Sequence, residues 1–229
     1  MNTADGTALV LIATGPYWRY VNPLIASMRK HLKLPGRIVP IVLTDNSDGT
    51  VDGIKLFTLH LGWPQVMLQR YRIILQEDIL DGFETLICQD VDMEYVEDIT
   101  FPIDKLFATT SPCQPSAMDE LWCRVDGSRA YTSPRESDGH SYCTGSLFGG
   151  PRDAVYDLLR QCQENIDHDL EYGIVNRRFP EEAHLNRYFL DHEHQTLSMG
   201  YCYPEKTYIQ PDHPRILTLS HPYLDAEKR

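Results

Sequence analysis

The amino-acid sequence predicts an α/β fold with a mostly parallel central sheet, in a single domain over residues 1–229. Two observations lead to this prediction. β-rich apolar runs alternate with amphipathic helical segments through the first half of the chain, and strands that alternate with helices form parallel sheets. The apolar content of 42% over 229 residues is also enough to bury one substantial core.

Three strands and two helices are expected in the first half. The apolar run Ala8–Thr14 suits a strand buried on both faces, and a turn follows at Gly15-Pro16. Apolar residues at spacings of three and four predict helices over Tyr17–Leu32 and over residues 66–80. Between them, the β-rich run Arg37–Thr44 predicts a second strand. The third strand is the short apolar run that ends at Gln89.

Two carboxylates follow that third strand directly, in Asp90-Val91-Asp92. Alternate residues of an extended chain point the same way, so both carboxylates are expected on one face. Paired oxygen donors suit Mg²⁺ or Mn²⁺, but a short acidic turn that closes a strand fits the same three residues. Ligands of open α/β sheets bind outside the carboxyl ends of the strands, which would place Thr14 and Asp45 in the same crevice.

The second half contains a long irregular stretch and two further candidate elements. Residues 108–141 are rich in Ser, Pro, Asp, Arg and Gly, and we expect a loop over the site there. A strand is expected over Tyr142–Gly150, where Gly145 and Ser146 allow either close approach of a ligand or tight packing.

A helix is then expected from Pro151, and another from Pro180. Glu181 and Glu182 fall in the first turn of the latter helix, where acidic residues complement the helix dipole without any catalytic role.

Composition limits the classes of function. A formal charge of −12 provides no basic surface for nucleic acid. Six scattered cysteines without C-x-x-C spacing indicate reduced thiols. Residues 1–7 lack a basic segment and the apolar run Ala8–Ala13 is too short to cross a bilayer, so no transmembrane segment and a soluble, cytoplasmic protein are expected.

Three ordered blocks of sequence carry a family resemblance: Asp90–Glu94 after a strand, Gly145 with Phe148–Gly150, and Glu182–Tyr188. Weaker matches are Tyr17–His31, Trp63 with Arg70, and Ser128–Tyr131. Over nearly its whole length the chain resembles family six of the retaining glycosyltransferases, which contains the blood-group A and B transferases and the α-1,3-galactosyltransferase. The resemblance implies a GT-A (Rossmann-like) fold whose N-terminal half binds UDP and whose C-terminal half binds the acceptor.

The resemblance also implies a role for each matching residue. The residues expected to bind UDP are Ile12, Ala13, Thr14, Tyr17, Asp90, Val91 and Asp92. Of these, Asp90 and Asp92 would bind Mn²⁺, with Mg²⁺ as a substitute. The residues expected near the donor sugar are Arg70, Thr144, Gly145, Ser146 and Glu181. The residues expected near the acceptor are Phe179, Glu182 and His184, and Glu182 would also face the anomeric carbon as the catalytic carboxylate.

Some positions depart from the family pattern. The membrane anchor and stem of the mammalian members are missing, which suggests a soluble bacterial or phage-type member. Ser111 replaces an acceptor-contacting histidine, and Pro204 lies near an acceptor-binding aspartate for which Glu205 could substitute. The basic end Lys228-Arg229 could fold over the diphosphate, as the family's tail does.

The implied activity is a metal-dependent, retaining transfer of galactose or N-acetylgalactosamine (GalNAc) from a UDP-sugar. The acceptor would be the 3-hydroxyl of a β-galactoside, with or without fucose, and the product an α-1,3 linkage. Glu182 would act as a nucleophile or as an electrostatic stabiliser, and the sequence leaves both open. Two other hypotheses are a non-catalytic module that binds nucleotide sugars or glycans and a retaining GT-A transferase of another family.

Overall fold

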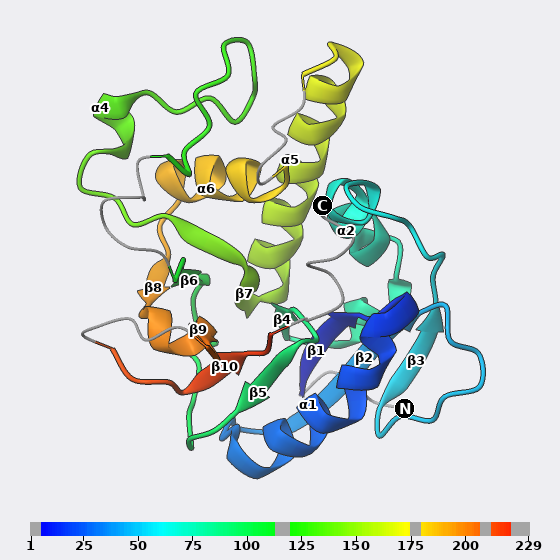
Figure 1. The fold of residues 1–229 in the computed structure, drawn as a ribbon. Helices are drawn as coiled ribbons and strands as arrows, with labels where there is room; N and C mark the ends of the chain where they lie inside the picture. The colour runs from blue at the N-terminus through cyan, green and yellow to red at the C-terminus, as the bar shows by residue number, and fades with distance from the viewer. Residues whose placement is uncertain (1–5, 113–119, 175–179, 207–211, 221–229) are drawn as a thin grey trace.

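The structure is a computed structural model that describes residues 6–112, 120–174, 180–206 and 212–220. Its main sheet has seven strands in the order β3-β2-β1-β4-β7-β6-β8, and a second sheet has the order β5-β10-β9 (Figure 1). The strands are β1 Gly6–Ile12, β2 Arg37–Thr44, β3 Ile54–Phe57, β4 Thr85–Gln89, β5 Met93–Tyr95, β6 Phe107–Thr110, β7 Cys143–Pro151, β8 Gln195–Leu197, β9 Tyr203–Pro204 and β10 Ile216–Thr218. The helices are α1 Trp18–His31, α2 Gln65–Leu75, α4 Pro134–Ser137, α5 Arg152–Glu171 and α6 Glu182–Asp191, with short 3-10 turns at Gly15–Tyr17, Asp78–Gly82 and Met199–Cys202.

Most neighbouring strands of the large sheet run parallel. β1 pairs in parallel with β2 and with β4, β2 pairs in parallel with β3, and β6 does so with β8. Only β7 is antiparallel to its neighbours, β4 and β6, among the described strands of this sheet. This arrangement confirms the predicted α/β class and the mostly parallel central sheet of a GT-A-type fold.

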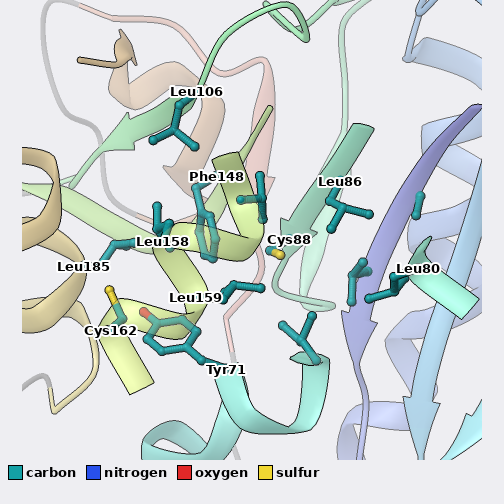
Figure 2. Close-up of a cluster of buried hydrophobic side chains, with 14 of the residues drawn as sticks. Tyr71, Leu80, Leu86, Cys88, Leu106, Phe148, Leu158, Leu159, Cys162 and Leu185 are labelled. Carbon is teal, nitrogen blue, oxygen red and sulfur yellow. The ribbon is translucent and has the colours of Figure 1, made fainter. Parts of the chain in front are cut away.

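Both faces of the central strands are buried, as the continuous apolar run in β1 predicts. Ala8 and Val10 belong to a core cluster that includes side chains of α2, α5 and α6, while Leu9 and Leu11 belong to a cluster built on α1. Figure 2 shows part of the first cluster, in which Tyr71 of α2 packs edge-on against Phe148 of β7 at 6.4 Å between ring centroids. Successive residues of one strand therefore anchor helices on opposite faces of the sheet.

Three expectations about element boundaries need correction. The helix predicted over residues 66–80 ends at Leu75, because Glu77 leaves helical geometry before a 3-10 turn begins. The stretch predicted as an irregular loop, 108–141, includes the end of β6 and the short helix α4, which Ser133 and Glu136 stabilise with a reciprocal capping box. The edge strand β3 was not expected, because its four residues are too few to show a clear period.

The thiols agree with the expected reduced state. Five cysteines, Cys88, Cys123, Cys143, Cys162 and Cys202, are buried and unpaired, and Cys113 lies outside the described residues. Within the described part of the chain, no helix combines the length and the hydropathy that crossing a bilayer requires.

Candidate active site

A buried arginine connects two of the predicted acidic residues. Arg70 lies on α2, and its Nη2 donates to Asp90 Oδ1 at 3.0 Å while its Nη1 donates to Glu181 Oε1 at 3.3 Å. Burial alone would lower the pKa of Arg70, but the charges of Asp90 and Glu181 outweigh it and raise that pKa further. Arg70 therefore brings together the end of β4 and the start of α6, which are far apart in the sequence.

Glu181 combines deep burial with an unused oxygen. Its side chain is 1% exposed, and its Oε2 has no hydrogen-bond partner among the described residues. Burial raises the pKa of Glu181, although Arg70 opposes the shift. A buried acceptor without a partner is costly, so this oxygen is available for a hydroxyl group of a bound ligand.

Glu182, the first residue of α6, points toward β7. Its Oε1 accepts a hydrogen bond from Gly145 N at 2.8 Å and another from the Thr144 hydroxyl at 3.1 Å. Burial raises the pKa of Glu182 to about 8, and the neighbouring charge of Glu181 adds to the shift. The carboxylate is therefore held in place by two donors in an environment that disfavours its charge, an arrangement typical of active sites.

Position 145 is closely packed against both glutamates. A Cβ atom there would lie 3.1 Å from Glu182 Cγ and 3.3 Å from Glu181 Oε1. These distances are shorter than ordinary contacts, so any larger residue would press against both glutamates. The absence of a side chain at position 145 therefore allows the side chains of Glu181 and Glu182 to approach the backbone closely.

Two hydroxyl groups of β7 connect Glu182 with the carboxylate after β4. Thr144 Oγ1 lies 3.1 Å from Ser146 Oγ. The Ser146 side chain lies close enough to Asp90 to oppose the rise in the pKa of that carboxyl group, and the Asp90 backbone N–H donates to Ser146 O at 2.8 Å. As expected from their spacing, Thr144 and Ser146 thus lie on the same side of the strand, and they complete a polar network with Arg70.

The residues predicted for the nucleotide lie at the carboxyl ends of β1 and β4, and β2 ends beside β1. Thr14 is buried, and its hydroxyl is 3.1 Å from His60 Nδ1. Gly15 N donates to Asp45 Oδ1 at 2.9 Å, which fixes the turn after β1. His60 was not singled out from the sequence, because a lone histidine in an irregular stretch gives no pattern.

Tyr17 connects this end of the sheet with the acidic pair. Burial raises its pKa well above the ordinary value, and the charges of Asp92 and Asp90 raise it further. The phenol therefore lies within range of electrostatic interaction with both carboxylates. Of the other residues predicted to bind UDP, Ile12 is half-buried at the end of β1, whereas Ala13 and Val91 are buried.

The acidic pair has the chemistry of a site for a hard divalent cation. Both Asp90 and Asp92 are half-buried, and burial together with the charge of Asp92 raises the pKa of Asp90, against the effect of Arg70. No group of three or more His, Cys, Asp or Glu side chains suited to a metal occurs within the described ranges. The two carboxylates fit a cation that takes its remaining oxygens from a bound diphosphate and water.

The predicted acceptor residues are only partly brought together. Phe179 lies outside the described residues, as do Lys228 and Arg229. His184 is buried with its Nε2 3.6 Å from Asp169 Oδ2, and burial lowers its pKa to about 4. Asp169 also accepts bonds from residues 128 and 129, so His184 lies in a cluster that fastens this segment to α5 rather than in the network around Glu182.

The two substituted acceptor positions have local roles in the structure. Ser111 N donates to Tyr142 O at 2.8 Å, just beyond the end of β6. Glu205 follows β9, and its Oε2 accepts a bond from Ser220 N at 2.9 Å. A contact of either residue with an acceptor stays a prediction.

The raised pKa of Glu182 gives a test that needs no substrate. A folded-state pKa of about 8 exceeds the unfolded value of about 4.3, so the folded protein keeps a proton that the unfolded chain loses between these pH values. The free energy of unfolding of the wild type should therefore fall across this window. Glu182→Gln does not titrate, and we expect it to gain roughly 4 kcal/mol over the wild type between pH 5 and pH 9.

Urea unfolding of metal-free and nucleotide-free protein at several pH values measures this difference. Glu164→Gln, at an exposed position of α5, is the matched control and should show no such gain. A constant difference between Glu182→Gln and the wild type at all pH values would contradict the raised pKa.

Comparison with known proteins places this site in a family. The model of glycosyltransferase family 6 matches residues 3–223. Globoside alpha-1,3-N-acetylgalactosaminyltransferase 1 of Gallus gallus is 26% identical over 231 residues, which cover 93% of this chain and 65% of that protein. Its namesake from Homo sapiens is 23% identical, over 96% of this chain and 66% of that protein. The chain thus spans about two thirds of the length of these relatives. Since the family model covers nearly all of its residues, the chain belongs to glycosyltransferase family 6, as its three motif blocks predicted.

Proposed function

We propose that this chain is a metal-dependent, retaining hexosyltransferase that moves GalNAc or galactose from a UDP-sugar to the 3-hydroxyl of a β-galactoside. The observation that carries the proposal is the anchored carboxylate of Glu182, held by Gly145 N at 2.8 Å and by the Thr144 hydroxyl at 3.1 Å. Arg70 joins Asp90 to Glu181, the residue that directly precedes Glu182. One site thus combines a candidate catalytic carboxylate with candidate groups for the diphosphate.

GalNAc is the first donor to test. The relatives from Gallus gallus and Homo sapiens are named as N-acetylgalactosaminyltransferases. The unpartnered Oε2 of Glu181 supports binding of a sugar, because a sugar hydroxyl would supply the missing donor. Galactose remains the alternative donor.

The proposed reaction separates charge, and the site offers groups for both signs. A divalent cation held by Asp90 and Asp92 would neutralise charge on the departing UDP. Arg70 adds a fixed positive charge beside Asp90. On the sugar side, Glu182 faces the anomeric carbon as it becomes cationic, either as a nucleophile or as a stabilising charge while the acceptor enters on the face that UDP leaves. Both routes retain the anomeric configuration.

Product analysis tests the proposal most directly. The protein is incubated with Mn²⁺ and UDP-GalNAc or UDP-galactose against β-galactosides with and without a 2-linked fucose, and against globoside. We expect an α-1,3-linked product from one donor. UDP-sugar binding without any transfer or donor hydrolysis would favour the non-catalytic module instead, and another linkage would contradict the proposed acceptor position.

Ser146 provides a prediction about donor choice. Enlarging it in Ser146→Val should lower kcat/KM for UDP-GalNAc more than for UDP-galactose, because the acetamido group needs room. We expect the ratio of the two kcat/KM values to change by about tenfold or more. Loss of the Ser146 hydroxyl beside Asp90 should affect both donors alike, so the ratio isolates the steric effect.

The matched control for this test is Ser141→Val, an exposed position just before β7. It should leave the ratio unchanged. Equal losses for both donors in Ser146→Val would remove Ser146 from the donor pocket.

A further inference from the structure

Asn186 joins helix α6 to strand β7 through its side-chain amide. Its Oδ1 accepts from Cys143 N at 2.7 Å, and its Nδ2 donates to Cys143 O at 2.8 Å. The same Nδ2 donates to Glu182 O, also at 2.8 Å. Asn186 is 1% exposed, so these bonds form away from water. A single side chain thus satisfies both backbone groups of one strand residue, as a neighbouring strand would.

Asn186 thus connects the strand that donates to the Glu182 carboxylate with the helix that carries Glu182. Cys143 directly precedes Thr144 and Gly145, which donate to Glu182 Oε1. Glu182 itself lies one turn before Asn186 on the same face of α6. The position of the carboxylate relative to its donors therefore depends on the distance that Asn186 fixes between helix and strand.

The ladder between β6 and β7 is interrupted beside Gly145, although Cys143 and Thr144 still pair with β6. In the pairing between β6 and β7, Ala108 faces Phe148 but the next residue, Thr109, faces Thr144, so residues 145–147 have no counterpart in β6. On the other side, the ladder with β4 ends at Leu147. Gly145 thus belongs to an irregular section of the strand, next to the point where Asn186 attaches.

We propose that Asn186 is a positioning residue for the transfer reaction: its amide fixes α6 against β7 at the one separation that places Glu182 Oε1 between Gly145 N and the Thr144 hydroxyl. This inference rests on the proposed catalytic role of Glu182. A residue that only stabilised the fold would affect activity whether or not the Glu182 carboxylate were present. A positioning residue acts through that carboxylate.

A double-mutant cycle on turnover separates these two roles. Asn186→Ala is combined with Glu182→Gln, and the release of UDP and the KM of the donor are measured for all four proteins. In the wild-type background we expect Asn186→Ala to lower kcat at least tenfold and to change donor KM less than threefold. In the Glu182→Gln background the same substitution should lower the residual kcat less than twofold.

Leu185→Val is the matched control, because Leu185 is fully buried on α6 but packs in the core cluster with α2 and α5. It should lower the melting temperature while kcat stays within threefold of wild type. If Asn186→Ala does not fold, Asn186→Asp takes its place under the same criteria, since it still accepts the bond from Cys143 N.

Two results would overturn the inference: a kcat within threefold of wild type, or equal losses in both backgrounds. Equal losses in both backgrounds, with the turnover of Glu182→Gln strongly reduced, would contradict the role of Asn186 alone. A fully active Glu182→Gln would contradict the proposed function itself.

Discussion

Glu182→Gln is expected to slow sugar transfer about 100- to 1,000-fold while UDP still binds. In the proposed reaction the carboxylate faces the centre where positive charge develops, so most of its interaction energy would be gained in the transition state. Gln keeps the shape of the side chain and an oxygen that can accept from Gly145 N, so the loss should come from the charge of the ionised form, which prevails above the pKa of about 8. Turnover, UDP affinity and melting temperature are measured together.

Glu181→Gln is the matched comparison, since it removes a charge from the adjacent residue. Glu181 contacts Arg70 and has one oxygen without a hydrogen-bond partner among the described residues, which we propose binds the donor sugar, so its loss should weaken use of the donor more modestly. If both glutamates only complemented the dipole of α6, each variant would lose at most about 1 kcal/mol of stability and keep its turnover. A fully active Glu182→Gln would exclude the catalytic role.

The structure argues against the dipole as the whole explanation. A side chain that only caps α6 would accept from N–H groups of its own helix, but Glu182 Oε1 accepts from Gly145 N and Thr144 on β7. The raised pKa of Glu182 also argues against the dipole as the whole explanation, because a helix N-terminus by itself would lower the pKa of a carboxyl group.

The sequence predicted the strands and helices in which apolar residues recur at a regular spacing. The apolar run of β1 gave a strand buried on both faces, and residues 8 to 11 do alternate between the two core clusters. The spacing of Val21, Leu24, Ile25 and Met28 gave α1, and all four are buried. These elements are predictable because repeated burial leaves a repeated pattern.

The sequence was less informative about individual side chains that bind distant segments of the chain. Asn186 and His60 act through bonds to backbone or hydroxyl groups of distant segments. No spacing rule identifies such partners, because their meeting depends on the tertiary packing of separate elements. His184 lies in a block of sequence that identified the family, but the block did not indicate its contact with Asp169 on α5.

Asp92→Asn is expected to abolish most of the activity with little effect on the fold. The substitution removes one of two carboxylates that suit a divalent cation, so we expect turnover to fall about 100-fold or more at saturating Mn²⁺, with much weaker Mn²⁺ binding. Stability should change by less than about 1 kcal/mol, because Asp92 is half-buried and its charge repels that of Asp90. Calorimetry with Mn²⁺, turnover and thermal unfolding measure the three effects.

Glu94→Gln is the matched control for this variant, because it removes the same charge from an exposed position two residues further along. It should keep both Mn²⁺ binding and turnover. Chelation of the wild-type protein by EDTA provides an independent measurement, since activity should disappear and return when Mn²⁺ or Mg²⁺ is added. Full transferase activity after EDTA treatment would contradict metal binding by Asp90 and Asp92. Arg70, already 3.0 Å from Asp90, would then be the group to examine for stabilising the departing diphosphate.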